Sequence, residues 1–222
     1  MSVRRRAAVL TAAVAAGCVA VSACGSVQMG AAALTGSNRI SSATLTNEIA
    51  NLNAAYKADK AKGVSPQLAV GQETQQVLTW LIRFQIGDKL AEQHDINITP
   101  AQVDKQFTKL RNEALQSEVT VPEYVSAGGA LPPDLVPQFA QYAAILTTLQ
   151  DRLTGGAATP TQAEQTAFQH DQCVASKSLG VAVNPQFGEF DYSSYSVVTA
   201  PPTLAANPSP SKAAAVQLTP PC

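Results

Sequence analysis

The 222-residue sequence carries hydrophobic side chains at 45% of its positions and charged side chains at 14%, with a formal net charge of −1. This length and hydrophobic content are sufficient for one sizeable domain. The near-zero charge does not provide the basic surface that nucleic-acid binding requires, so no nucleic-acid partner is expected. No internal apolar run is long enough to span a bilayer.

The first residues have the pattern of a secretory signal peptide. Three arginines, Arg4–Arg6, precede a short apolar stretch over 7–20. The stretch ends in a four-residue motif that resembles the lipobox of bacterial lipoproteins: Val21, Ser22, Ala23 and Cys24. The resemblance implies cleavage after residue 23, a lipid on the Cys24 sulfur and a mature protein anchored to the cell membrane outside the cytoplasm. The alternative is an ordinary signal peptide whose cleavage site happens to precede a cysteine.

Four segments are predicted from this pattern and from the composition. Residues 1–23 are predicted to be a lipoprotein signal peptide and residues 24–30 a tether. Residues 31–198 are predicted to form the folded domain. Residues 199–222, rich in Pro and Ala, form a tail that can bury little of its surface.

The domain is predicted to open with a strand over 31–35, a turn over 36–38 and a helix. Leu45, Ile49, Leu52 and Tyr56 recur at helical spacing, and Gly63 ends this first helix. Ser65-Pro66 is a suitable cap and first position for the central helix, although Gly71 leaves the first residue of this helix open.

This central helix shows no polar stripe between Val77 and Ile86, so we expect it to be covered from several sides, with Leu81 and Ile82 buried. Trp80 and Phe84 lie four residues apart within it. Such a pair is typical of a core, but either ring could instead line a groove for unfolded segments. The sequence does not locate a groove, so substrate-binding residues stay unassigned.

Three more elements complete the predicted fold. Thr99, Pro100 and Gln102 form a capping-box start for a helix, and 120–127 is predicted to be a short turn. A helix with an apolar stripe from Leu135 to Leu153 should pack on the central helix. A last helix, started by Thr159-Pro160, leads to a strand at 181–183. The fold class is therefore mainly α: a compact domain of about five helices, with a small β-sheet that joins the N- and C-terminal strands.

The order of these motifs resembles a known family. The apolar VLTWLI segment, the extended INIT step and the capped helix after it resemble the N-terminal chaperone domain of SurA/PrsA-type extracytoplasmic foldases. VNPQFGEFD resembles the C-terminal strand and turn of actinobacterial SurA-like lipoproteins that lack a parvulin domain. The resemblance implies a chaperone-like domain that binds unfolded or secreted polypeptides. Related foldases often insert a parvulin prolyl-isomerase domain, but the residues between Phe168 and Asn184 are too few to hold one.

No pattern in the sequence indicates catalysis. His94 and His170 fall on polar helix faces, where a solvated histidine is expected. Cys, His and carboxylate residues are not clustered at metal-ligand spacing, and GxSxG and P-loop motifs are absent. We therefore predict a non-enzyme without metal or cofactor. The alternatives are a structural or adaptor lipoprotein that binds a cell-envelope partner and, less favoured, a prolyl isomerase.

The remaining prediction concerns cysteine pairing. Cys18 would leave with the signal peptide and Cys24 would carry the lipid, so Cys173 and Cys222 are left in an oxidising compartment. Two such thiols in one chain tend to pair, which predicts a disulfide between them. In the alternative, Cys173 is a small buried residue and Cys222 is a free or intermolecular thiol.

Overall fold

Six α-helices, one 3-10 turn (Pro133–Leu135) and five short strands form residues 30–199, the part of the chain that the computed structural model describes. The mainly helical fold with a small sheet is confirmed. None of the described helices is both long and apolar enough to cross a bilayer. The helices are α1 (Ser42–Ala61), α2 (Glu73–Gln93), α3 (Pro100–Gln116), α4 (Val121–Gly129), α5 (Val136–Thr154) and α6 (Gln162–Leu179). The strands are β1 (Ala31–Thr35), β2 (Asn38–Ser41), β3 (Ala182–Val183), β4 (Glu189–Asp191) and β5 (Ser196–Val198).

The helix starts are set by short capping sequences. The predicted capping box at the start of α3 is confirmed, because Thr99 and Gln102 bond to each other's backbone N–H groups. The predicted start of α6 lies two residues too early, since its N-cap is Thr161, which forms a capping box with Glu164. A carboxylate in the first turn also interacts favourably with the helix dipole, which favours Glu164 over the neutral Gln162 as the partner.

Two other boundaries differ from the prediction. The central helix α2 begins at Glu73, not at Ser65-Pro66. Gly71 has a φ of 91°, which is incompatible with a right-handed helix, so the helix cannot run through this residue. The Gly71 N–H donates to the Glu73 carboxylate. The segment predicted as a short turn at 120–127 is the full helix α4, and it brings the number of α-helices among residues 30–199 to six. Thr120 and Glu123 start it with another capping box.

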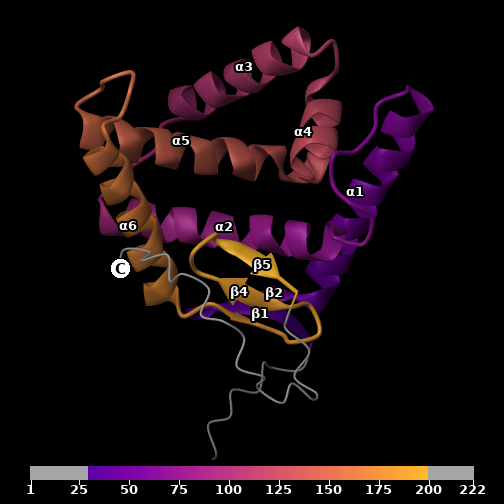
Figure 1. The fold of residues 1–222 in the computed structure, drawn as a ribbon, viewed down its shortest axis with the longest axis horizontal. Helices are drawn as coiled ribbons and strands as arrows, with labels where there is room; N and C mark the ends of the chain where they lie inside the picture. Colours follow the sequence, from indigo (N-terminus) through magenta and orange to yellow (C-terminus); the bar gives the residue numbers. More distant parts are fainter. Residues whose placement is uncertain (1–29, 200–222) are drawn as a thin grey trace, which may run out of the picture.

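Helix α2 runs across the middle of the molecule, between α5 and the strands, as Figure 1 shows. As predicted, it is covered from several sides, whereas Leu81, for which burial is predicted, is half-buried at the contact of two apolar clusters. The fully or almost fully buried apolar side chains of α2 are Val77, Leu78, Ile82, Phe84, Ile86 and Leu90.

The first sheet joins the two ends of the described chain. Strand β1 lies between β2 and β3, and it pairs antiparallel with β3 through Ala33 opposite Val183. This is the predicted pairing of the N- and C-terminal strands, and it is confirmed. The alanines of β1 are completely buried, because their small side chains let the strand approach the helices closely.

The second sheet, a hairpin of β4 and β5, is not among the predicted elements. The Val197 side chain is buried in the main apolar cluster, and its N–H donates to Thr79 Oγ1 of α2 over 2.8 Å. Arg83 Nε of α2 donates to the Tyr195 carbonyl over 2.9 Å. The hairpin is therefore fastened onto α2 by buried and half-buried hydrogen bonds as well as by apolar packing.

Candidate functional site

A hollow of about 410 Å³, called here the Trp80 groove, opens among α2, α3, α4 and α5. Its lining is mainly apolar and aromatic, with only two polar side chains. Small-molecule and peptide sites in proteins share this composition, in which apolar walls supply affinity and a few polar groups orient the ligand. The lining side chains are Gln67, Trp80, Leu110, Glu113, Tyr124, Val125, Leu131 and Phe139.

The Trp80 ring is held in place on several sides while remaining half-exposed. Its Nε1–H donates to the Gly129 carbonyl over 2.9 Å, and the Phe139 ring meets it edge-on at 5.3 Å between centroids. The Arg83 guanidinium lies 5.3 Å from the ring centroid. Edge-to-face and cation–π contacts of this kind hold an aromatic ring in place, and here they leave part of the ring exposed. The ring is therefore a rigid part of the groove before anything binds.

The structure shows that Phe84 and Trp80, for which the sequence leaves both a core and a groove position open, lie in different surroundings. Phe84 is only 8% exposed and packs in an apolar cluster, with its ring edge-on to Tyr142. Trp80 instead lines the groove. The sequence does not make this distinction, because the opposite wall is built by α4, which its composition predicts to be only a turn.

Two glycines at the end of α4 keep one side of the groove open. A Cβ atom added to Gly128 or Gly129 would have no atom within 4 Å, apart from the adjacent residues and the backbone of its own helix. Gly128 is exposed, and both glycines line the groove. Side chains at these positions would project into open space, so the glycines make the opening wide.

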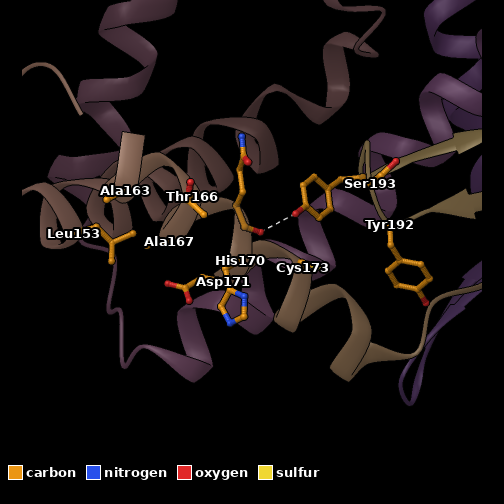
Figure 2. Close-up of a pocket in the computed structure, with 11 residues that line it drawn as sticks. Leu153, Ala163, Thr166, Ala167, His170, Asp171, Cys173, Tyr192 and Ser193 are labelled. Carbon is orange, nitrogen blue, oxygen red and sulfur yellow. Dashed lines mark hydrogen bonds between the residues drawn. The ribbon is translucent and has the colours of Figure 1, made fainter. Parts of the chain in front are cut away.

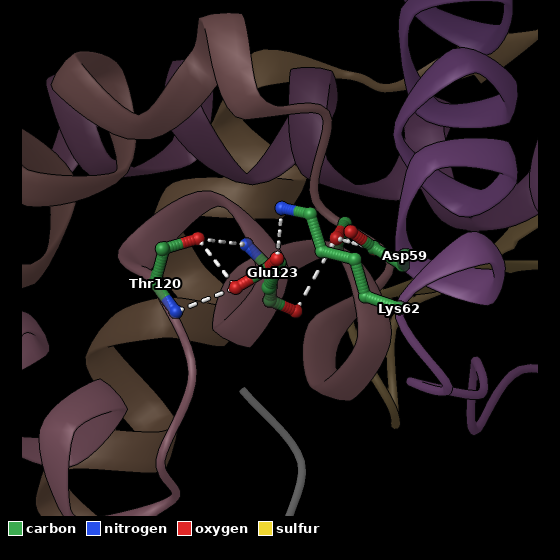
Figure 3. A network of polar contacts seen from close by, with 5 residues as sticks. Asp59, Lys62, Thr120 and Glu123 are labelled. Atoms are coloured by element: carbon green, nitrogen blue, oxygen red, sulfur yellow. Dashed lines mark hydrogen bonds and ion pairs between the residues drawn. The ribbon is translucent and has the colours of Figure 1, made fainter.

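Helix α4 is fastened to α1 by a polar network, shown in Figure 3. The Ser126 hydroxyl donates to the buried Asp59 carboxylate over 2.6 Å, and Lys62 forms an ion pair with Glu123. Nearby, the Gln67 N–H donates to the Ala127 carbonyl over 2.9 Å. These bonds fix the α4 wall of the groove relative to the rest of the domain.

The electrostatics of the α4 region are set by these contacts. The hydrogen bond from Lys62, reinforced by the backbone and side chain of Thr120, lowers the pKa of Glu123 from its ordinary 4.5 to about 2. Burial, followed by the charge of Glu113 and a hydrogen bond to it, raises the pKa of Tyr124. Tyr124 therefore stays neutral at physiological pH, whereas Glu123 stays ionised well into the acid range.

The lowered pKa of Glu123 can be tested through the pH dependence of stability. Because the folded pKa of Glu123 lies below the unfolded value, the unfolded chain binds more protons, so its contribution to stability is present above about pH 4.5 and is lost as the pH falls towards about 2. The free energy of unfolding should be measured by urea titration between these limits for the wild type and for Glu123→Gln. We expect the difference between them to shrink with falling pH. A constant difference would contradict this assignment.

The predicted site residues fall both inside and outside the described chain. Cys24, the lipobox residues Val21, Ser22 and Ala23, and Cys222 lie outside residues 30–199, so lipidation and the predicted pairing stay predictions. Cys173 lies on α6, half-buried, and takes part in a disulfide bond. Its partner is not among the described residues.

The two histidines lie in different surroundings. His170 is exposed, as expected. His94 is not simply solvated: it is the C-cap residue directly after α2, it is half-buried, and its Nε2 lies 3.4 Å from Asp171 Oδ2 of α6. The sequence does not reveal this contact, because α6 approaches the end of α2 only in the folded chain. Within residues 30–199, no group of three or more His, Cys, Asp or Glu side chains is arranged to hold a metal ion.

No protein-family model, curated protein or solved structure matches this chain. The resemblance to SurA/PrsA-type domains therefore rests on the sequence motifs alone. The geometry of the Trp80 groove is the structural basis for assigning a function.

Proposed function

We propose that the chain is a membrane-anchored extracytoplasmic lipoprotein whose helical domain binds unfolded or secreted polypeptides without catalysing a reaction. The observation that carries the proposal is the Trp80 groove, an apolar hollow with a rigid aromatic ring in its wall. An unfolded chain exposes the apolar and aromatic side chains that such a groove can cover. The polar groups in the lining, Gln67 and Glu113, are few enough that binding would depend on apolar character more than on a particular sequence.

The rigidity of the groove supports this function. A surface that is already ordered loses little conformational entropy when a ligand binds, so even a flexible, unfolded segment can be held with useful affinity. The network that joins Glu123 and Ser126 of α4 to α1 provides that order. The resemblance to chaperone domains points to the same class of ligand.

The groove can be tested with the single tryptophan of the chain, Trp80, as its own fluorescent probe. The ligand is a reduced and carboxymethylated globular protein, which cannot refold. Gly128→Lys should weaken binding at least about tenfold, or about 1.4 kcal/mol, because a bound apolar segment would have to cover an ammonium group. The readout is the dissociation constant from Trp80 fluorescence, together with suppression of aggregation of a heat-denatured client.

Gly128→Ala is the matched control. It changes the same exposed position, adds a single methyl group where no atom lies within 4 Å, and should leave the dissociation constant within about twofold. A lysine near a helix C-terminus interacts favourably with the helix dipole, so Gly128→Lys should still fold. Equal binding by both variants would place the binding surface elsewhere. A wild-type chain that binds no unfolded protein would contradict the proposed function itself.

The membrane anchor has a separate test. Replacing Cys24 with serine removes the only sulfur of the Val21–Cys24 motif, so lipidation should be abolished and the protein should leave the membrane fraction. Metabolic labelling with a fatty-acid analogue in a bacterial host measures this directly. Continued labelling of the Cys24→Ser variant would show that another residue carries the lipid or that the motif is not a lipobox.

A further inference from the structure

A second hollow, of about 610 Å³, lies away from the Trp80 groove, between α6, the end of α5 and the turn that joins β4 to β5. Figure 2 shows Ala163, Ala167 and Cys173 along α6, with Tyr192 approaching from the turn. None of the residues that line the Trp80 groove lines this hollow. It therefore needs an explanation of its own.

The chemistry of this hollow suits an extended chain rich in small residues and proline. Ala163 and Ala167 leave room along α6, and Tyr192 and Tyr195 supply aromatic rings at the opposite side. The Tyr195 hydroxyl donates to the Gln169 carbonyl over 2.7 Å, which fixes that ring against α6. Proline-rich segments bind to surfaces of this kind, since their stiff extended backbone has little entropy to lose and their rings pack on aromatic faces.

The chain contains such a segment next to the hollow in sequence. Residues 200–222 include six prolines and six alanines among 23 residues, and Lys212 is their one charged side chain. The segment comes directly after the described residues, which reach Thr199 just after β5. A fully extended run of this length spans roughly 75 Å, so its far end can reach any point of the domain.

The hollow and the C-terminal segment each contain a cysteine. Cys173 lines the hollow and takes part in a disulfide bond, and the last residue of the sequence is Cys222. We propose that this hollow is the docking site of the chain's own C-terminal segment, with residues 219–222 lying along α6 and Cys222 joined to Cys173. This is the pairing expected from the cysteine count. It rests on the proposed function, because a disulfide requires the oxidising compartment outside the cytoplasm. The Trp80 groove plays no part in it.

The covalent step is balanced by an external disulfide. The thiols of Cys173 and Cys222 lose two protons and two electrons as one S–S bond forms, and the disulfide that accepts them is reduced to two thiols. Docking of residues 219–222 beside Cys173 raises the effective concentration of the second thiol. The intramolecular bond should therefore be more stable than it would be on an undocked tail.

Two measurements on the full mature chain test the proposal. Peptide mapping without reductant should find Cys173 linked to Cys222, and any other partner for Cys173 would overturn it. The equilibrium constant for closing the bond against a glutathione buffer should then be compared among the wild type, Ala167→Trp, which fills the hollow, and Lys177→Trp, an exposed α6 site outside it. We expect a fall of at least about tenfold for Ala167→Trp and a change within about twofold for Lys177→Trp. Equal constants would overturn docking.

A third measurement does not depend on the folding of Ala167→Trp. Hydroxyl-radical labelling reports the exposure of Tyr192 and Tyr195, which the docked segment would cover. We expect both to be labelled several-fold faster in Cys222→Ser than in the oxidised wild type. Equal labelling rates would overturn the proposal. These outcomes are independent of binding at the Trp80 groove, so this inference and the proposed chaperone function can fail separately.

Discussion

Ile82→Ala is expected to lower the free energy of unfolding by about 2–5 kcal/mol, because it removes three carbons from a completely buried site. Ile82 lies in the middle of α2 and belongs to the larger apolar cluster, to which α1, α5 and the strands also contribute. The helices around it are fixed by other contacts, so the cavity cannot collapse fully and part of its cost remains. For a domain of this size, each kcal/mol corresponds to about 2–4 °C in melting temperature.

Urea denaturation of the mature protein measures this loss as a lower midpoint at an unchanged slope. The control is Val70→Ala, since Val70 is 98% exposed in the loop before α2 and its truncation should cost no more than about 0.5 kcal/mol. A cost at Val70 equal to that at Ile82 would mean that the buried part of this region had been placed wrongly.

The buried side of the fold could be predicted because local patterns decide it. Between Val77 and Ile86 the few polar residues form no stripe along the helix, which indicates a helix that is covered on several sides, and the capping box at Thr99 fixes the start of the next helix. Both are properties of neighbouring residues. The pairing of β1 with β3 was also predictable, since a short strand at each end of the domain needs a partner.

The candidate site could not be predicted in the same way. The Trp80 groove depends on α4, whose nine residues include two glycines and which reads as a turn. The capping box of Thr120 and Glu123 is a local signal for a helix start that the sequence does contain, but the helix is also held by long-range bonds to Asp59 and Lys62, more than 50 residues earlier in the chain. Contacts over such separations leave no periodic signal in a sequence. The hairpin of β4 and β5 escaped prediction for a similar reason, since Thr79 and Arg83 of α2 hold it in place.

The hairpin of β4 and β5 leads to a second prediction, a loss of stability in Gly188→Ala. Gly188 stands directly before β4 with a φ of 125°, where a side chain is strained, and a Cβ atom there would lie inside van der Waals contact of the Val198 carbonyl oxygen. The obstacle is backbone, so no rotamer change relieves it. Gly188→Ala must either change its own φ or push β5 away from β4.

Either response disturbs the attachment of the hairpin to α2. Val197, one residue before Val198, is buried in the main cluster and donates its N–H to Thr79, so displacement of β5 would break a buried hydrogen bond and loosen apolar packing. We expect Gly188→Ala to cost at least about 2 kcal/mol, the sum of backbone strain and overpacking at their lower limits. Amide hydrogen exchange should show faster exchange at Val197 than in the wild type.

Gly128→Ala is the matched control for this substitution. It makes the same chemical change in a helix, at a residue without positive φ and with no atom within 4 Å of the new Cβ. Alanine is the better helix former by up to about 1 kcal/mol, so stability should stay the same or rise. If Gly188→Ala unfolded at the same urea concentration as the wild type and kept its Val197 protection, the hairpin would not be held against α2 in the way described. If Gly188→Ala lowers the free energy of unfolding and speeds amide exchange at Val197, while Gly128→Ala does neither, the glycine at position 188 is required for the close approach of β4 and β5.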